Sequence, residues 1–279
     1  MTRNKLSKIK ILQLILSLLI ALLIIILFKT YFFSIFNKNI CEFQPFITTT
    51  IPKIKNFPWK QTALITLWFD DAYASQGSHE VLQLMDEYQI VGAISVPTTF
   101  ICKPGYLSWN QLIRLQQKGW EVVSHGTNHY CKPYRYNDIT VVISEIKGSQ
   151  DTLVKKGLRA DHFVMPCDLK PVLVPLAWEY SKKVYKSYRR AAEQINPIPV
   201  SDAYNLYSFA ITNQTTDLEI KNLLESASLQ KGWLILVFHR IDHSKDDDAI
   251  TFEKFAKLLK NINDANIPIA LPSQVLNIR

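Results

Sequence analysis

Two histidines in the segment SHGTNHY, His125 and His129, stand four residues apart directly after the apolar run WEVV. Imidazoles at this spacing can converge on one point, as zinc ligands do, although so short a match also arises by chance in loops. Paired carboxylates, Asp70 and Asp71, follow TALITLWF, and His239 follows WLILVF. Two imidazole nitrogens and one carboxylate oxygen would bind a divalent metal and leave a position open for water. The second carboxylate could then serve as general base for that water.

From Thr62 onward, short apolar or β-branched runs alternate with longer amphipathic runs. Such repeated β-then-α units predict parallel strands with helices packed outside. Seven or eight units suit a distorted, closed or nearly closed (β/α) barrel of about 220 residues. The predicted strands are TALITLWF, VGAISVP, WEVVSH, HFVMP, KSYRRAA, NLYSFAIT and WLILVFH.

The polar residues above all follow predicted strands. Asp70 and Asp71 end the first strand, His125 and His129 follow the third, and His239 ends the penultimate one. Active residues of such barrels lie at the C-terminal ends of the strands. Each group alone has a simpler explanation, as a helix cap or a hydrogen-bonded histidine. Their joint placement at the C-terminal end of the predicted barrel favours a catalytic site.

These residues resemble the polysaccharide deacetylases with a NodB-homology domain, carbohydrate esterase family 4, from Thr62 to about Ser273. The TFDDG-like motif of that family is matched at residues 69–71, and the resemblance implies that Asp70 is the base and Asp71 a metal ligand. The H-x-x-x-H match implies that His125 and His129 complete the ligand set. The metal implied is Zn²⁺, with Co²⁺ or Ni²⁺ as alternatives.

The same resemblance implies that His239 is the general acid, because it ends a late apolar strand. FVMPCD at residues 163–168 departs from an R-x-P-Y-like segment of many members, so the Arg that orients the base is missing. Arg189 and Arg190 are candidates to replace it. Cys167 matches the Tyr whose backbone N–H stabilises the oxyanion, a role that tolerates the change of side chain. Ala72 stands where many members have Gly.

The implied reaction is hydrolysis of the N-acetyl groups of N-acetylglucosamine in a cell-wall or extracellular polysaccharide. One alternative is a polysaccharide O-acetyl esterase, since both reactions pass through a tetrahedral oxyanion. Another is an inactive, membrane-tethered glycan-binding domain, which the missing Arg motivates. Tyr73, Tyr130 and Tyr134 lie near the motifs and could either stack on sugar rings or pack against the protein.

The N-terminus predicts a membrane anchor. Residues 11–28, ILQLILSLLIALLIIILF, carry no charge and are long enough to cross a bilayer. No A-x-A cleavage pattern follows, so we expect an uncleaved signal anchor over residues 11–36. The basic segment 1–10 then lies in the cytoplasm, and a Pro-containing stalk, residues 37–60, leads to a catalytic domain, 61–279, outside the cell membrane.

Charge and cysteine content narrow the partners. The net charge is +8, but residues 1–40 hold six basic and no acidic residues, which leaves the remainder near neutral. The excess of basic residues therefore reflects the orientation of the N-terminal segment in the membrane and not a surface for nucleic acid. We expect polysaccharide and membrane as partners but no nucleic acid. The sequence assigns no oligomeric state. Four cysteines are too few for a disulfide scaffold, although one pair could oxidise, and each is expected to be a small buried hydrophobe. They are Cys41, Cys102, Cys131 and Cys167.

Overall fold

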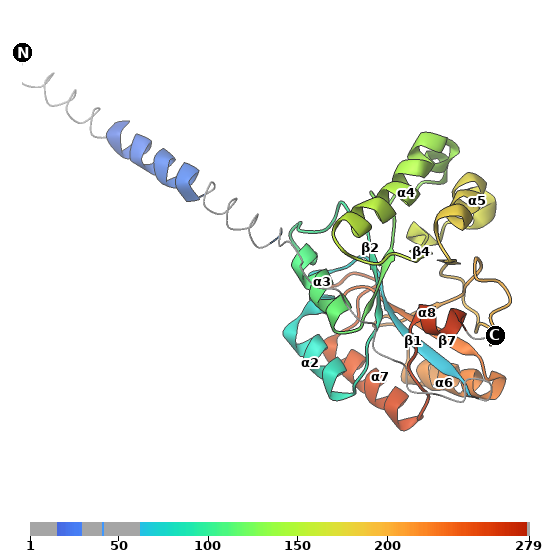
Figure 1. Cartoon of the computed structure of the whole chain (residues 1–279). Helices are drawn as coiled ribbons and strands as arrows, with labels where there is room; N and C mark the ends of the chain where they lie inside the picture. The colour runs from blue at the N-terminus through green and yellow to red at the C-terminus, as the bar shows by residue number, and fades with distance from the viewer. Residues whose placement is uncertain (1–15, 30–40, 42–61, 278–279) are drawn as a thin grey trace, which may run out of the picture. The chain divides into compact units, whose positions relative to one another are not determined.

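The computed structural model describes residues 16–29, 41 and 62–277 (Figure 1). The chain divides into two compact units, Met1–Phe43 and Gln44–Arg279. Residues 16–29 are helical, and no helix within the described ranges is both long and apolar enough to cross a membrane. The predicted segment 1–10 lies outside the described residues, as do the ends of the predicted anchor 11–36 and all of the stalk 37–60 except Cys41. The anchor therefore stays a prediction.

The second unit is built on one parallel sheet of seven strands, in the order β5-β4-β3-β2-β1-β7-β6. Each strand falls within a run that the sequence predicts. The strands are β1 (Leu64–Phe69), β2 (Ala93–Val96), β3 (Glu121–Ser124), β4 (His162–Val164), β5 (Ser187–Arg189), β6 (Phe209–Ala210) and β7 (Trp233–Phe238).

The prediction of a distorted barrel is confirmed in part: the seven strands form a curled sheet, and within residues 62–277 its two edge strands do not pair with each other. β5 and β6 are the two edges of the sheet, and they have only three and two residues. An irregular segment runs along the β5 edge before it enters β6: the N–H of Leu206 donates to the carbonyl of Tyr188, and the N–H of Arg190 donates to the carbonyl of Leu206. These hydrogen bonds pair backbone N–H and C=O groups at the β5 edge that would otherwise need a neighbouring strand.

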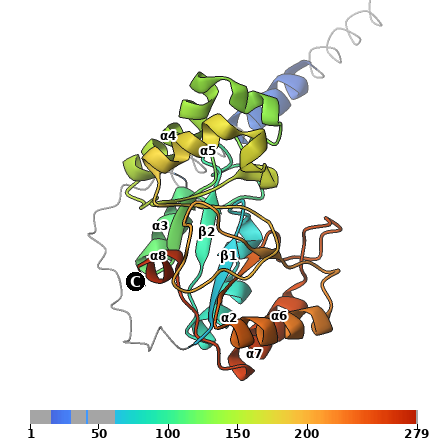
Figure 2. The same cartoon turned by 90° about the vertical axis from the view of Figure 1, so that its right-hand side faces the viewer.

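Helices cover the outside of the curled sheet, with α4 packed beside α5 and α6 beside α7 (Figure 2). Four begin at a Ser or Thr whose hydroxyl accepts a backbone N–H of the first turn, as the N-cap position favours. The short α8 was not predicted. The helices are α2 (His79–Glu87), α3 (Trp109–Gln117), α4 (Ile139–Lys155), α5 (Pro175–Val184), α6 (Asp217–Gln230), α7 (Phe252–Asp264) and α8 (Pro272–Leu276).

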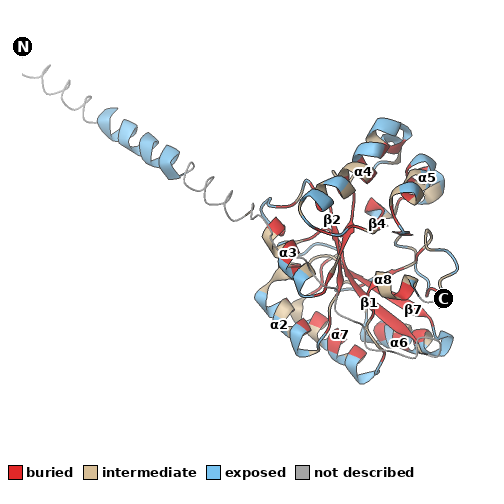
Figure 3. Cartoon of the chain, in the orientation of Figure 1, coloured by how far each residue is buried: buried red, intermediate tan, exposed pale blue. Residues whose placement is uncertain are grey.

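The longest strand pairing in the sheet is that of β1 with β7, which are aligned over six residues and buried along their whole length (Figure 3). Inside the curl, Trp68 and Trp233 pack with residues of neighbouring strands and with Val275 of α8. The register places Phe69 opposite Phe238. The next residue of each chain segment therefore emerges at the same edge of the sheet.

Candidate metal centre and active site

The C-terminal edge of the sheet collects the predicted site residues. Asp70 follows β1 directly and His239 follows β7, and the N–H of Asp70 donates to the carbonyl of Phe238 at 2.8 Å. His125 follows β3, and its N–H bonds to the carbonyl of Val96 at the end of β2. Parallel strands thus bring side chains from three separate parts of the chain to one mouth, as the barrel argument requires.

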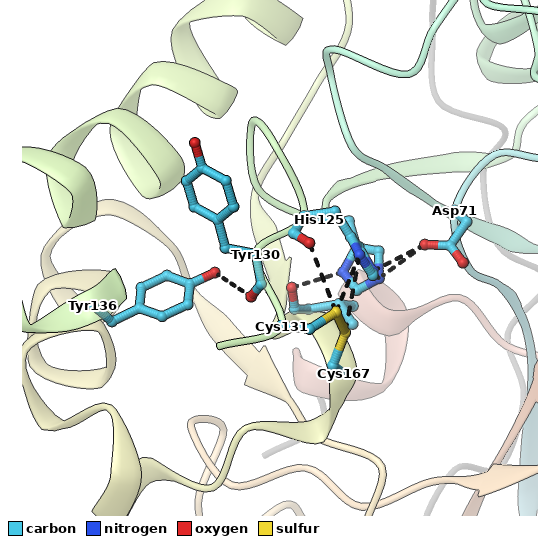
Figure 4. Close-up of a disulfide and its surroundings, with 8 residues drawn as sticks. Asp71, His125, Tyr130, Cys131, Tyr136 and Cys167 are labelled. Carbon is cyan, nitrogen blue, oxygen red and sulfur yellow. Dashed lines mark hydrogen bonds and ion pairs between the residues drawn. A yellow bond between two sulfur atoms is a disulfide. The ribbon is translucent and has the colours of Figure 1, made fainter. Parts of the chain in front are cut away.

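Asp71, His125 and His129 form a cluster of potential ligand atoms. Figure 4 shows Asp71 and His125, two of the three. Asp71 Oδ1 lies 3.4 Å from His125 Nε2 and 3.1 Å from His129 Nε2, and the two Nε2 atoms are 3.2 Å apart. Zinc bonds of about 2.0–2.1 Å in a tetrahedron separate neighbouring ligands by about 3.3–3.4 Å. The three observed separations are close to that value, so these residues fit a divalent metal.

The hydrogen bonds of the cluster agree with this fit. His125 Nδ1 lies 2.9 Å from the carbonyl oxygen of Val164, which requires the proton on Nδ1 and leaves the lone pair of Nε2 facing the cluster. Asp71 Oδ1 is buried and accepts no hydrogen bond from the described residues. Burial alone would raise the pKa of Asp71, but His125 and His129, when they carry a proton on Nε2 in place of a metal, lower it below the usual range. The carboxylate is therefore held in its metal-binding form.

Asp70 does not share this cluster but pairs with Arg189 at the end of β5. Arg189 Nη2 donates to Asp70 Oδ2, its Nη1 donates to Ser208 Oγ at 2.8 Å, and its guanidinium lies 4.8 Å from the ring centre of Trp68. Burial alone would raise the pKa of Asp70, but the guanidinium of Arg189, helped by the nearby His125 and His239, lowers it. Asp70 Oδ1 is buried without a hydrogen-bond partner among the described residues.

Of the two arginines expected as candidates to replace the missing one, the structure brings Arg189 to Asp70. Arg190 instead stacks on Tyr207, with 5.3 Å from its guanidinium carbon to the ring centre. Consecutive residues of a strand point to opposite faces of the sheet, which explains why only one of the pair reaches Asp70.

Gln76 is a site residue that sequence reasoning missed. Its side chain is fully buried, and its Nε2 donates to the carbonyl of Asp70 at 2.5 Å and to the carbonyl of His239 at 2.7 Å. One carboxamide thus ties together the segments that follow β1 and β7. The His239 ring is half-buried, and its Nδ1 finds no hydrogen-bond partner among the described residues.

Cys167 lies in the segment after β4, in the left-handed backbone region with φ of 56°. The expectation that each cysteine is a buried hydrophobe is wrong: Cys102, Cys131 and Cys167 are exposed, and Cys41 is half-buried. Cys131 and Cys167 form a disulfide (Figure 4). They meet because the segments after the neighbouring strands β3 and β4 leave the same edge. Their sulfur atoms lie 3.8 and 4.0 Å from His129 Nδ1. As a disulfide, they offer no thiolate to a metal.

The tyrosines near the motifs pack against other side chains. The Tyr73 ring stacks on Tyr106 with 5.2 Å between centres, and the guanidinium carbon of Arg240 lies 4.3 Å from the centre of the Tyr73 ring. Arg135 contacts the rings of Tyr130 and Tyr134 in the same way. Half-buried Tyr73 keeps part of its surface accessible, so sugar stacking on it stays a prediction.

A comparison with protein families decides the relationship. The model of the polysaccharide deacetylase family matches residues 60–168, the part that carries both aspartates and the H-x-x-x-H motif. The resemblance to polysaccharide deacetylases is thereby confirmed. A search of curated proteins found no match.

Solved structures of carbohydrate esterase family 4 share the deacetylase fold. A T48 deacetylase with substrate is 14% identical, with a TM-score of 0.51 over 79% of this chain and 94% of its own. A family 4 carbohydrate esterase from Bacillus anthracis is also 14% identical, with a TM-score of 0.51 over 77% of this chain and 83% of its own. A family 4 pseudoenzyme from the same organism is 7% identical, with a TM-score of 0.50 over 77% and 66%. Similarity at these identities establishes the fold alone.

Proposed function

We propose that this protein is a metal-dependent deacetylase that hydrolyses N-acetyl groups of N-acetylglucosamine units in a cell-wall or extracellular polysaccharide. The observation that carries the proposal is the convergence of Asp71, His125 and His129 on one point at 3.1–3.4 Å. The next residue along the chain, Asp70, supplies a buried carboxylate. Its Oδ2 pairs with Arg189, and its Oδ1 has no hydrogen-bond partner among the described residues.

Asp71 Oδ1, His125 Nε2 and His129 Nε2 would hold the metal, which we propose to be Zn²⁺, with Co²⁺ or Ni²⁺ as alternatives. When bound, such an ion polarises a carbonyl and lowers the pKa of a coordinated water. Three protein ligands leave room for both, as in catalytic rather than structural zinc sites.

Asp70 is proposed as the general base. Its Oδ2 is occupied by Arg189, so Oδ1 is the oxygen that can accept a proton from the attacking water. The lowered pKa of Asp70, which the guanidinium of Arg189 maintains against the effect of burial, keeps the carboxylate ionised at neutral pH. Arg189 thus both orients the base and prevents its protonation.

His239 is proposed as the general acid that protonates the departing amine, because it leaves β7 beside Asp70 and Gln76 fixes both backbones. The backbone N–H of Cys167 would stabilise the oxyanion of the tetrahedral intermediate. Tyr73, half-buried beside these residues, would contact the sugar. Acetate and a free amine on the glycan are the products.

We further propose that the catalytic domain is extracytoplasmic and tethered to the cell membrane by the N-terminal segment. The exposed disulfide Cys131–Cys167 supports this location, because such bonds persist in oxidising compartments. The basic residues before the apolar run 11–28 support the same orientation.

The test is metal analysis of the purified full chain together with acetate release from N-acetylglucosamine oligomers and from acetylated xylan. Metal-dependent release from the oligomers is the expected result. Release from acetylated xylan alone would assign the site to O-acetyl ester hydrolysis. Bound metal without release from any glycan tested would point to a glycan-binding domain.

A further inference from the structure

The two metal-binding histidines lie in an irregular segment, not on a helix. Residues 125–131 contain no helix or strand, and the backbone φ is 79° at Gly126 and 56° at His129. On a helix, a spacing of four residues places two side chains on one face automatically. In an irregular segment nothing local fixes their separation. The 3.2 Å between the Nε2 atoms of His125 and His129 must therefore be imposed from outside.

Glu145 of α4 makes the contacts that could impose it. Its carboxylate is fully buried, and among the described residues it accepts hydrogen bonds from Thr127 and Asn128, which lie between the two histidines. Oε2 accepts the backbone N–H of Thr127 at 3.1 Å and of Asn128 at 2.9 Å, while Oε1 accepts the side-chain amide of Asn128 at 2.6 Å. Next to it, the hydroxyl of Thr127 donates to the carbonyl of Ser144 at 2.6 Å.

The chemistry of these contacts requires a carboxylate. Three N–H donors converge on two oxygens that only accept, whereas a glutamine would turn an NH₂ group toward a donor. All of the partners named are neutral N–H groups, so the buried charge is stabilised by hydrogen bonds to the segment and not by a cation. Burying a carboxylate in this way is costly, and each bond to the charged group is correspondingly strong.

Gly126 shows how closely the segment approaches the carboxylate. A Cβ at this position would lie 3.0 Å from Glu145 Oε2, and the φ of 79° is one that residues with side chains rarely adopt. From the opposite side, the N–H of Thr98 donates to the carbonyl of Gly126 at 3.2 Å, and Thr99 donates to the carbonyl of Thr127. The segment is thus held between α4 and the residues that follow β2.

We propose that Glu145 is a positioning residue whose carboxylate fixes the His125–His129 segment in the shape that binds the metal. This inference assumes one part of the proposed function, namely that His125 and His129 are metal ligands. It does not assume the reaction or the substrate. The hydrogen bonds of the Glu145 carboxylate go to Thr127 and Asn128, and none that the described residues form reaches the imidazoles of His125 and His129. The effect of Glu145 is on metal affinity, because a segment free to relax would have to be ordered at the moment of binding.

The test compares Glu145→Gln with Asp151→Asn in the full chain. Asp151 lies on the same helix, is exposed, and pairs with Lys147 one turn away, so its substitution removes a carboxylate from α4 without touching the segment. Each protein is stripped of metal and titrated with Zn²⁺ against a chromophoric chelator. We expect the Kd of Glu145→Gln to rise by about 10- to 100-fold, the range found for residues that orient metal ligands, and that of Asp151→Asn to stay at the wild-type value.

A merely structural role would give a different result. It would lower the thermal unfolding midpoint of the metal-free protein while the folded protein bound Zn²⁺ with wild-type affinity, and that outcome would overturn the proposal. Should Glu145→Gln fail to fold, Asn128→Ala removes one of the three donors and leaves the carboxylate in place. A smaller rise in Kd is then expected, and an unchanged Kd would count against the proposal.

The two proposals fail separately. If the wild-type chain binds Zn²⁺ but releases no acetate from any glycan, the proposed function is wrong and the Kd comparison still decides the role of Glu145. If the wild-type chain binds no Zn²⁺ at all, both are wrong.

Discussion

Asp70 and Asp71 are adjacent and chemically identical, but we predict that Asp71 binds the metal and Asp70 accepts a proton. Substituting each residue separately therefore distinguishes metal binding from proton transfer. Asp71 Oδ1 lies within 3.4 Å of both imidazole Nε2 atoms, whereas Asp70 Oδ2 is bound to Arg189 on the far side. Asp71→Ala removes one of only three protein ligands. We expect this variant to purify largely free of metal and inactive, with partial recovery in excess metal.

Asp70→Asn should behave in the opposite way. The variant keeps all three ligands, so its metal content should equal that of the wild type. Its kcat should fall by about 10²- to 10⁴-fold, or about 3–5 kcal/mol in activation free energy, because an amide cannot accept the proton of water. The change also removes the charge that Arg189 faces, and Arg189 is only 1% exposed. The free energy of unfolding should therefore fall by about 3 kcal/mol, which urea unfolding would measure.

The assay sets metal stoichiometry beside the rate of acetate release for both variants, each checked for folding by circular dichroism. Loss of metal from Asp70→Asn with retention by Asp71→Ala would show that the roles are reversed. Full activity in both variants would show that the reaction takes place elsewhere in the molecule.

Three further predictions concern the surroundings of the site. The variant Arg189→Met should retain the metal but lose turnover, and wild-type turnover would refute the orienting role. Because the substitution leaves a buried carboxylate unpaired, the free energy of unfolding, measured by urea titration, should fall by about 3–5 kcal/mol. Replacing Cys131 and Cys167 by Ser removes a cross-link over 36 residues and should lower the free energy of unfolding by about 3–4 kcal/mol, with wild-type stability as the contrary result. A reporter fused after Arg279 should be active only outside the cytoplasm, and cytoplasmic activity would contradict the predicted topology.

The fold was predictable because its signal is local and repeated. Every observed strand lies within an apolar or β-branched run of the sequence, and four of the helices, α2, α3, α6 and α7, begin at a Ser or Thr cap. Closure of the barrel was not predictable, since it depends on strand length. The sequence KSYRRAA yields only Ser187–Arg189 as β5, and NLYSFAIT yields only Phe209–Ala210 as β6. Strands of three and two residues are too short to pair around a closed ring.

The proposed ligand set, Asp71, His125 and His129, could be named from the sequence because two local motifs contain it. Its support was not, since the partners are distant: Arg189 is 119 residues from Asp70, and Gln76 is 163 residues from His239. Only the order and register of the strands bring them together. The disulfide was missed for the same reason, because pairing Cys131 with Cys167 requires that β3 and β4 be neighbours.

Glu145 differs from these residues, because a signal for it stood in the sequence. The buried face of α4 consists of Val142, Glu145, Ile146, Ser149 and Leu153, which recur at the spacing of a helix. An ionisable residue on that apolar stripe must find hydrogen-bond donors or be expelled from the core. In this chain the donors are the backbone N–H groups of Thr127 and Asn128, in the irregular segment that carries the histidines. The position of Glu145 on the buried face of the helix that follows the H-x-x-x-H motif was therefore a sign, in the sequence, of a contact between that helix and another polar segment.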